Sequence, residues 1–211
     1  MKYKKYIEQI KEWPNEGNHI MAQYDKDKII VYQSYRPEIG NFSVKNQYFG
    51  GAFSLTRMTW IKPNFLWMMY RNGWGTKEGQ EVVLAIHLKL EAFERYLSQA
   101  VWSSYTPDQY ENREEWKSKV QASNIRLQWD PDHDPHGNKL ERRAIQIGIR
   151  NEEIVSFAKE DIIKIEDISD YVKDQYEHVK NNTLDQLIVP EEKSFIPNNK
   201  TSIQRLNITI S

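Results

Sequence analysis

Residues 125–149, IRLQWDPDHDPHGNKLERRAIQIGI, decide the fold class that the sequence predicts. The two ends of this stretch, 125–129 and 142–149, are rich in alternating or β-branched apolar residues, as expected of strands. The twelve residues between them suit a hairpin better than a helical crossover. Helices and strands alternate elsewhere, so we predict α+β: a single domain with a mixed, mainly antiparallel sheet packed with helices.

Outward from this hairpin, the apolar pattern predicts the other elements. Strands are expected at 28–35, 53–60, 81–88 and 162–168, and helices at 3–12, 64–72, 91–101, 113–123, 151–159 and 169–179. Helix 64–72 is apolar on nearly every side, which indicates burial, and Gly73 supplies its C-terminal stop. Residues 37–42 are expected to turn. The predicted domain covers 1–180, and 181–211 is expected to be a C-terminal tail of doubtful order.

The composition limits the class of protein and the kind of ligand. The absence of cysteine excludes disulfides, thiolate zinc sites and a cysteine nucleophile. No apolar run approaches the roughly 18 residues of a membrane helix, so we expect a cytoplasmic protein without a membrane partner. Residues 151–211 hold 12 acidic and 7 basic residues, which leaves 18 acidic and 22 basic residues in 1–150. This basic part favours an anionic small molecule or a nucleic-acid end as partner, and leaves the oligomeric state open.

The loop 130–141 carries one candidate constellation. Asp130, Asp132 and Asp134 alternate, and Glu141 stands at position 12, as in a calcium-binding loop. However, Pro135 occupies position 6, where such a loop requires glycine for a sharp turn. His133 and His136 with these aspartates suit a transition metal, which makes a metal-dependent hydrolase an alternative function. A solvated hairpin loop with capping carboxylates is the simpler interpretation, so no residue is assigned as a metal ligand.

Basic residues near strand ends form a second candidate constellation: Arg36, Arg57, Lys62, Arg71, Lys77, Arg142 and Arg143. Arginine and the amides of a helix N-terminus both suit phosphate, and Lys62 lies just before the predicted buried helix. Surface pairing with nearby acids is the alternative for each of them. The glycines match neither a phosphate-binding loop nor a dinucleotide fingerprint.

Five motifs together resemble the domain of unknown function 4291 family over about residues 20–175: VYQSYRPEIG, RMTWIKPNFLWMMYRNGWGTK, RLQWDPDHDP, RRAIQIGIR and IEDISDYV. The length of these motifs and their tryptophan content make the resemblance specific. It implies a family without an established activity, and no mechanism.

The order of elements is similar, more loosely, to the ADP-ribosyltransferase superfamily, whose sheet is split by a cleft. The corresponding parts are IIVYQSYR, FSLTRMTW with its helix, EVVLAIHL and ERRAIQIGI, without that superfamily's His-Gly pair or Glu-x-Glu. The resemblance implies NAD as cofactor and a role for ten residues. The catalytic candidates are Glu141 and Gln146, and the cofactor-binding candidates are Gln33, Arg36, Ser54, Thr56, Arg57, Lys62, Tyr70 and Arg143.

Three functions follow as hypotheses. The first is an ADP-ribosyltransferase-like enzyme that uses NAD to modify a nucleic-acid or protein target, with arginines on the pyrophosphate and a carboxylate near the ribose. The second is an RNA- or nucleotide-binding module without catalysis, in which the ligand stays unaltered. The third is the metal-dependent hydrolase centred on residues 130–136.

Overall fold

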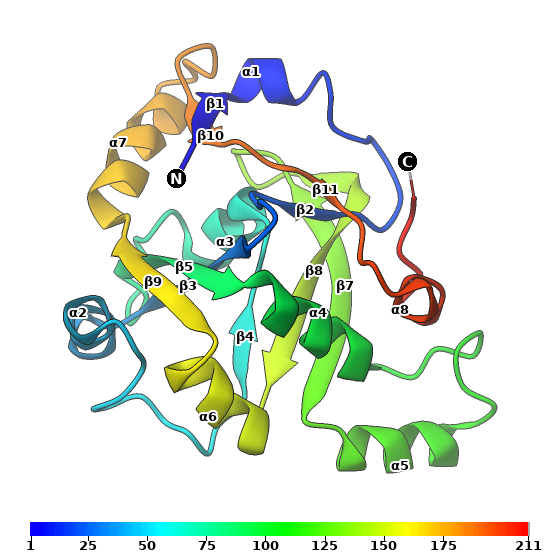
Figure 1. The fold of residues 1–211 in the computed structure, drawn as a ribbon. Coiled ribbons are helices and arrows are strands. Elements are labelled where there is room, and N and C mark those ends of the chain that lie inside the picture. The colour runs from blue at the N-terminus through cyan, green and yellow to red at the C-terminus, as the bar shows by residue number, and fades with distance from the viewer. Residues whose placement is uncertain (211) are drawn as a thin grey trace.

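The computed structural model describes residues 1–210, and two larger sheets form its centre (Figure 1). The three-stranded sheet has the order β3 (Lys28–Tyr35), β5 (Val82–Lys89) and β9 (Ile162–Asp167), with antiparallel pairing throughout. The four-stranded sheet has the order β4 (Thr59–Ile61), β8 (Lys139–Ile149), β7 (Ile125–His133) and β6 (Val101–Trp102), and β6 pairs parallel with β7. The predicted α+β class with a mixed, mainly antiparallel sheet is therefore confirmed.

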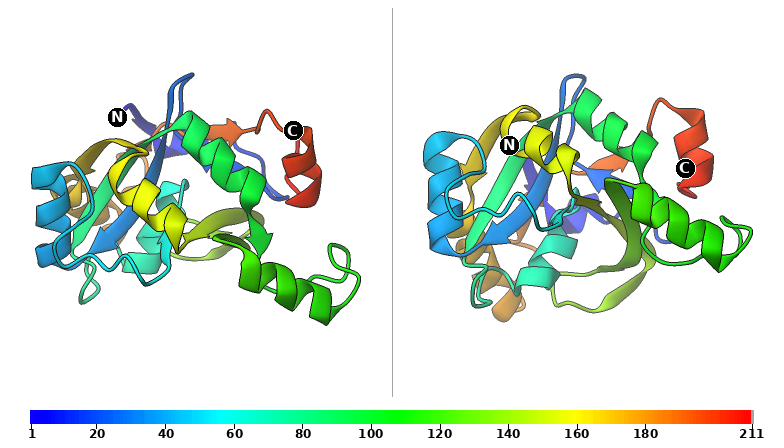
Figure 2. Two further views of the ribbon diagram at one scale, coloured as in Figure 1. Left: turned by 60° about the horizontal axis from the view of Figure 1, so that its bottom comes forward. Right: turned by 90° about the horizontal axis from the view of Figure 1, so that it is seen from below.

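Helices cover both sides of the three-stranded sheet (Figure 2). In chain order they are α1 (Tyr6–Gln9), α2 (Pro37–Asn46), α3 (Phe65–Asn72), α4 (Leu90–Gln99), α5 (Arg113–Ala122), α6 (Glu152–Lys159), α7 (Ser169–Lys180) and α8 (Lys200–Arg205). Helices α4 and α6 contribute to one apolar cluster, while α3 and α7 contribute to a second. No helix of residues 1–210 is long and apolar enough to cross a membrane.

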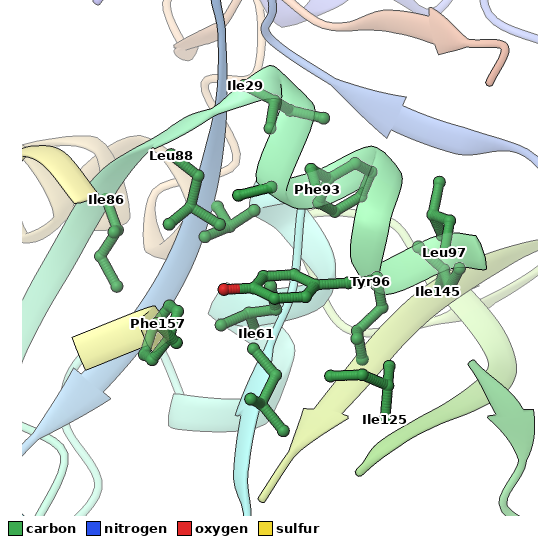
Figure 3. Packing of buried hydrophobic residues seen from close by; sticks show 14 of the residues in the cluster. Ile29, Ile61, Ile86, Leu88, Phe93, Tyr96, Leu97, Ile125, Ile145 and Phe157 are labelled. Atoms are coloured by element: carbon green, nitrogen blue, oxygen red, sulfur yellow. The ribbon is translucent and has the colours of Figure 1, made fainter. Parts of the chain in front are cut away.

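The larger apolar cluster lies between the two sheets and α4. Figure 3 shows Phe93 and Tyr96 of α4 among Ile61, Ile125 and Ile145 of the four-stranded sheet. All five side chains are buried. Each fully buried side chain of this size adds roughly 1.5–3 kcal/mol, so this cluster is the main source of stability.

The two sheets differ in how many faces they bury. In β3, Ile29 and Val31 face the larger cluster, whereas Ile30 and Tyr32 face the second cluster. The three-stranded sheet is therefore apolar on both faces, as expected of strands covered by helices on each side. The four-stranded sheet turns one face to the larger cluster, while its other face carries mainly polar side chains, several of them buried. That polar face contains the candidate site described below.

The predicted hairpin is confirmed, but its loop is shorter than expected. Strand β7 continues to His133 and β8 begins at Lys139, so the loop spans only 134–138. A register shift between Pro131 and His133 accommodates the proline, which cannot donate a hydrogen bond to the ladder.

Three local expectations were wrong. Residues 3–12 form β1 (Tyr3–Lys5) and only a short α1, because Tyr3 to Lys5 pair with a distant strand. Residues 37–46 form α2, in which Pro37 occupies the first helical turn, where its missing N–H costs no hydrogen bond. The expected strand 53–60 is reduced to β4, the three residues that pair with β8.

The segment expected to be a C-terminal tail contributes β10 (Ile188–Pro190), β11 (Lys193–Phe195) and α8. Strand β10 pairs with β1, and β11 pairs with β2 (Ile20–Ala22). The C-terminal segment thus lies against the N-terminal segment, as Figure 1 shows at the top of the molecule.

Candidate functional site

The candidate site lies on the polar face of the four-stranded sheet. In β7, Gln128 and Asp130 alternate with the buried residues Leu127 and Trp129, so their side chains project from the other face. In β8, Gln146 alternates with buried isoleucines in the same way. We call five residues together the Lys62 face: Trp60, Lys62, Gln128, Asp130 and Gln146.

Trp60 covers the edge of this face nearest β4. It pairs in register with Gly148 of β8. A Cβ atom on Gly148 would come within 3.0 Å of the Trp60 ring, so the indole lies directly over the glycine. A glycine in the middle of a strand weakens that strand, and the close approach of the Trp60 ring explains why glycine is found here.

Both carboxylate oxygens of Asp130 are held by side-chain amides. Gln128 Nε2 donates to Oδ1 at 2.8 Å, and Gln146 Nε2 donates to Oδ2 at 2.7 Å. Gln128 lies two residues before Asp130 on β7, and Gln146 lies opposite Gln128 on β8, so both amides are next to the carboxylate. The carboxylate therefore has a fixed orientation on a half-exposed surface.

Lys62 is the most unusual residue of the site. Only 7% of it is exposed, and no carboxylate among residues 1–210 lies within 4.0 Å of its ammonium. Its Nζ donates to the Trp60 carbonyl at 3.4 Å, a long hydrogen bond. The pKa of Lys62 is lowered to about 8: burial is the main cause, the charge of Arg71 adds to the lowering, and Asp130 opposes it.

Helix α3 places Lys62 and borders the site. Its first turn is fixed by Asn64, whose side chain accepts from the Trp67 N–H at 2.6 Å. Gly73 ends the helix in the left-handed conformation with φ of 59°. The short helix thus positions Lys62, just before it, and Arg71, in its last turn, and both Arg71 and Asp130 are close enough to act on the pKa of Lys62.

An aromatic stack lies along the exposed side of α3. The Tyr70 ring lies parallel to the His133 ring at 3.5 Å between centroids, and Trp67 stacks on the same imidazole at 5.2 Å. His133 is 2% exposed, and neither ring nitrogen has a hydrogen-bond partner among the described residues. Burial lowers the pKa of His133, with Asp132 opposing the shift. Tyr70 itself is 42% exposed and offers a flat ring to a ligand.

Gln33 lies at the joint between the two sheets. Its Nε2 donates to Thr59 Oγ1 at 2.6 Å and to the Trp60 carbonyl at 3.0 Å, while its Oε1 is buried without a partner among the described residues. Tyr35 and Thr59 share a further hydrogen bond of 2.9 Å. These groups lie beneath β4, on the side facing the core.

The predicted site residues therefore divide into two groups. Lys62 and Gln146 lie on the Lys62 face, with Gln33 beneath it and Tyr70 on the adjoining helix. The others lie elsewhere: Arg36 pairs with Glu38 at 3.1 Å, Ser54 and Thr56 contact each other at 3.2 Å in an exposed loop, and Arg57, Glu141 and Arg143 are exposed. Glu141 and Gln146 are five residues apart on one strand, which is about 16 Å and places them on opposite faces.

The aspartates of the hairpin are engaged separately. Asp132 Oδ2 accepts from Arg142 at 2.6 and 2.9 Å, and burial nevertheless raises the pKa of Asp132. Asp134 accepts from Asn138 at 2.9 Å. Within residues 1–210 no three His, Asp or Glu side chains are grouped as metal ligands. Asp134 therefore stabilises the loop 134–138, whereas Asp132 is buried against Arg142.

Sequence reasoning missed Gln128 and considered Asp130 as a metal ligand or as a capping carboxylate of the loop. The signal was present in the alternation of polar residues 126, 128 and 130 with apolar residues 125, 127 and 129. Such alternation indicates a strand with one polar face, and Gln146 opposite Gln128 continues that face onto the next strand.

Comparison with protein families shows which family the chain belongs to. Residues 19–195 match the domain of unknown function DUF4291, so the chain belongs to this family. The match covers the Lys62 face, both larger sheets and β11. Comparison with curated proteins found no match. The family description carries no activity and no link to ADP-ribosyltransferases, so the looser resemblance stays a prediction.

Proposed function

We propose that the Lys62 face binds NAD and that the protein is an ADP-ribosyltransferase-like enzyme. One observation carries the proposal: the face holds a buried lysine and, near it, a carboxylate that two amides hold in place. Within residues 1–210 no carboxylate lies within 4.0 Å of the lysine ammonium, so the lysine has no salt-bridge partner. The two charged groups are close enough for Asp130 to act on the pKa of Lys62. A cation and a positioned carboxylate are the two groups that NAD cleavage requires of a site.

Lys62 and Arg71 supply the anion-binding part of the proposed site. Burying an ammonium without a counter-ion is costly, and an arriving phosphate would remove that cost. Arg71 lies 6.0 Å from the centroid of the Trp67 ring, so its guanidinium is held near the face. The pyrophosphate of NAD carries two negative charges that these two cations can bind.

Asp130 supplies the carboxylate of the proposed reaction. The bond between the nicotinamide nitrogen and ribose C1′ breaks, and its electron pair leaves with nicotinamide. Positive charge develops on the ribose, C1′ then bonds to the acceptor oxygen or nitrogen, and the acceptor proton passes to water. A carboxylate beside the ribose stabilises this charge. We assign this role to Asp130 rather than to Glu141, because Glu141 lies on the opposite face, and Gln146 acts as a positioning residue.

The acceptor is proposed as a nucleic-acid end or a protein side chain. The basic balance of residues 1–150 supports an anionic partner, and the exposed Tyr70 ring supports one with a planar base. The same features support binding without catalysis, so the experiment must separate the two.

The test combines binding with product analysis. Melting temperature is measured with NAD, AMP, GTP and a short RNA, and free nicotinamide is then assayed after incubation with NAD and candidate acceptors. We expect a rise of several degrees with NAD at about a hundred times its Kd, and the rise should be lost in Lys62→Met. Asp130→Asn should bind NAD but release no nicotinamide, whereas Asp134→Asn, a change in the same hairpin, should do both. Binding of RNA or another nucleotide alone would identify a binding module, and no response to any ligand would refute the site.

A further inference from the structure

A cavity of about 460 Å³ lies away from the Lys62 face. The N-terminal segment, the start of β3, one residue of β5 and the residues around β11 form its walls, and none of the five residues of the Lys62 face lines it. Its volume is in the usual range for small-molecule sites, which is roughly 300–1,000 Å³.

Three lysines of this cavity have no acidic partner. Lys2, Lys28 and Lys193 line it, and no carboxylate among residues 1–210 lies within 4.0 Å of any of their ammonium groups. Lys193 instead lies 4.5 Å from the centroid of the Tyr24 ring, another wall residue. Three ammonium charges are thus available to a ligand.

The carboxyl groups of the cavity are mostly engaged by the protein. Glu12 pairs with Lys4 at 3.0 Å. Asp25 accepts from the backbone N–H of Asp27 at 2.9 Å and of Lys28 at 3.0 Å, and these bonds lower its pKa. Such local bonds fix a carboxylate to its own turn and leave less of it to compensate a neighbouring lysine.

Glu192 is the deepest acid of the cavity and is committed to α3. It is 5% exposed, and its carboxyl accepts from the Phe65 N–H at 2.7 Å and from Asn64 Nδ2 at 3.2 Å. Burial holds its pKa well above the ordinary value for glutamate, which reduces the negative charge that it brings. Glu191, which is exposed, and Asp25, whose pKa is lowered in part by the charge of Lys28, are the acids that oppose the three free lysines.

The floor of the cavity is polar but weakly charged. His87 is buried there, with its Nε2 2.6 Å from Glu166 Oε1. Burial lowers the pKa of this imidazole, and the attraction of Glu166 opposes the shift. The imidazole of His87 can exchange hydrogen bonds with a ligand while the three free lysines supply the charge.

We propose that this cavity is a second binding site, for a small molecule that carries two or more phosphate groups. Three ammonium groups around one hollow suit several negative charges, and lysine binds phosphate as a point charge. The site is independent of the NAD site proposed above, because the two share no residue.

The experiment measures binding of tripolyphosphate by calorimetry and by melting temperature, with ATP and citrate in parallel. The Lys28→Met/Lys193→Met double variant removes two of the free cations, and Lys45→Met removes an exposed cation of α2 as the matched control. Lys62→Met separates this site from the Lys62 face. We expect tripolyphosphate to raise the melting temperature of the wild type by about 5 °C or more at a hundred times its Kd. The rise should persist in Lys45→Met and Lys62→Met and disappear in the double variant.

Three results with the phosphate ligands would overturn the proposal. These are no rise with either tripolyphosphate or ATP, an equal rise in the double variant, and loss of the rise in Lys62→Met alone. An equal response to citrate would also overturn it, by showing that any polyanion suffices. If ATP binds and tripolyphosphate does not, the ligand is a nucleotide whose base is required. Nuclear magnetic resonance of the wild type provides a measure that needs no variant, since tripolyphosphate must shift the His87 side-chain signals if it enters the cavity.

Discussion

Tyr32 and Lys62 exchange backbone hydrogen bonds and so join the two larger sheets. The Tyr32 N–H donates to the Lys62 carbonyl at 2.7 Å, and the Lys62 N–H donates to the Tyr32 carbonyl at 3.3 Å. The lysine of the candidate site therefore lies at the junction between the sheet that is apolar on both faces and the sheet with a polar face. The backbone of Lys62 is held by these two hydrogen bonds, while burial of its charged ammonium group costs free energy.

We predict that Lys62→Met stabilises the protein at pH 7. The pKa of Lys62 falls from its ordinary value of 10.5 to about 8 in the folded protein. At about 1.4 kcal/mol per pKa unit, the charged lysine costs up to about 3 kcal/mol, and methionine of similar length removes this cost. The folded state binds fewer protons than the unfolded state between pH 8 and 10.5. The cost is therefore full below pH 8 and is relieved as the pH rises to 10.5.

Urea unfolding of the wild type and Lys62→Met at several pH values measures this prediction. The advantage of the variant should shrink from pH 8 to 10.5, whereas Lys45→Met should show no such trend. A stability difference that does not change with pH would contradict the assigned cause.

We predict that Arg142→Met destabilises the protein by about 3–5 kcal/mol, because it leaves the buried Asp132 carboxylate without its counter-ion. Replacing both residues, as Asp132→Leu with Arg142→Met, should cost clearly less than the single change. Chemical denaturation of the two variants makes the comparison. Equal losses in the single and double variants would show that packing, rather than the unpaired charge, is responsible.

We predict that Tyr70→Ala raises the pKa of His133 toward the ordinary value of 6.5. The Tyr70 ring covers the imidazole at 3.5 Å, and burial is the main cause of the lowered pKa. Removal of the ring admits water and reduces the cost of charging the imidazole. A pH titration followed by nuclear magnetic resonance measures the change, with Tyr48→Ala as a control, since that ring packs against Phe42 instead. An unchanged pKa would mean that other groups exclude the water.

We predict that two changes at Glu192 affect the free energy of unfolding to different extents. Glu192→Gln keeps an oxygen that accepts from the Phe65 N–H and removes a carboxyl whose ionisation burial opposes, so its stability should stay within about 1 kcal/mol of the wild type. Glu192→Ala leaves the first turn of α3 without this acceptor and should cost about 1–3 kcal/mol. Thermal unfolding separates the two, and equal losses would show that the carboxylate charge matters rather than the hydrogen bond.

The sequence predicted the elements that carry a strong local pattern. Strand β3, helix α3 and the β7–β8 hairpin were expected because their apolar residues recur at the spacing of a strand or a helix. Helix α2 was missed because residues 37–42 were expected to turn, although the proline that begins them is well suited to a first helical turn. Strands β10 and β11 have three residues each, too few for a period, and they form because distant partners are available.

The site was predictable in part for the same reason. Lys62 was a candidate from its place before a buried helix, and Gln146 was a candidate only from the resemblance to the ADP-ribosyltransferase superfamily. The hydrogen bonds that link Gln146 to Asp130, and the separation of Glu141 from both, depend on which residues pair across the hairpin. A shift of one residue in that pairing would turn each side chain to the other face, and periodicity alone does not fix it.

The pairing of β1 with β10 has a consequence for how the protein is made. Tyr3 pairs with Pro190, so β1 leaves the ribosome long before the strand with which it pairs. Until Glu192 has been made, the Phe65 N–H in the first turn of α3 lacks its hydrogen-bond acceptor. Strand β1 and its apolar neighbours stay open to other contacts until β10 has been made, and assistance by a chaperone would be most useful during this interval.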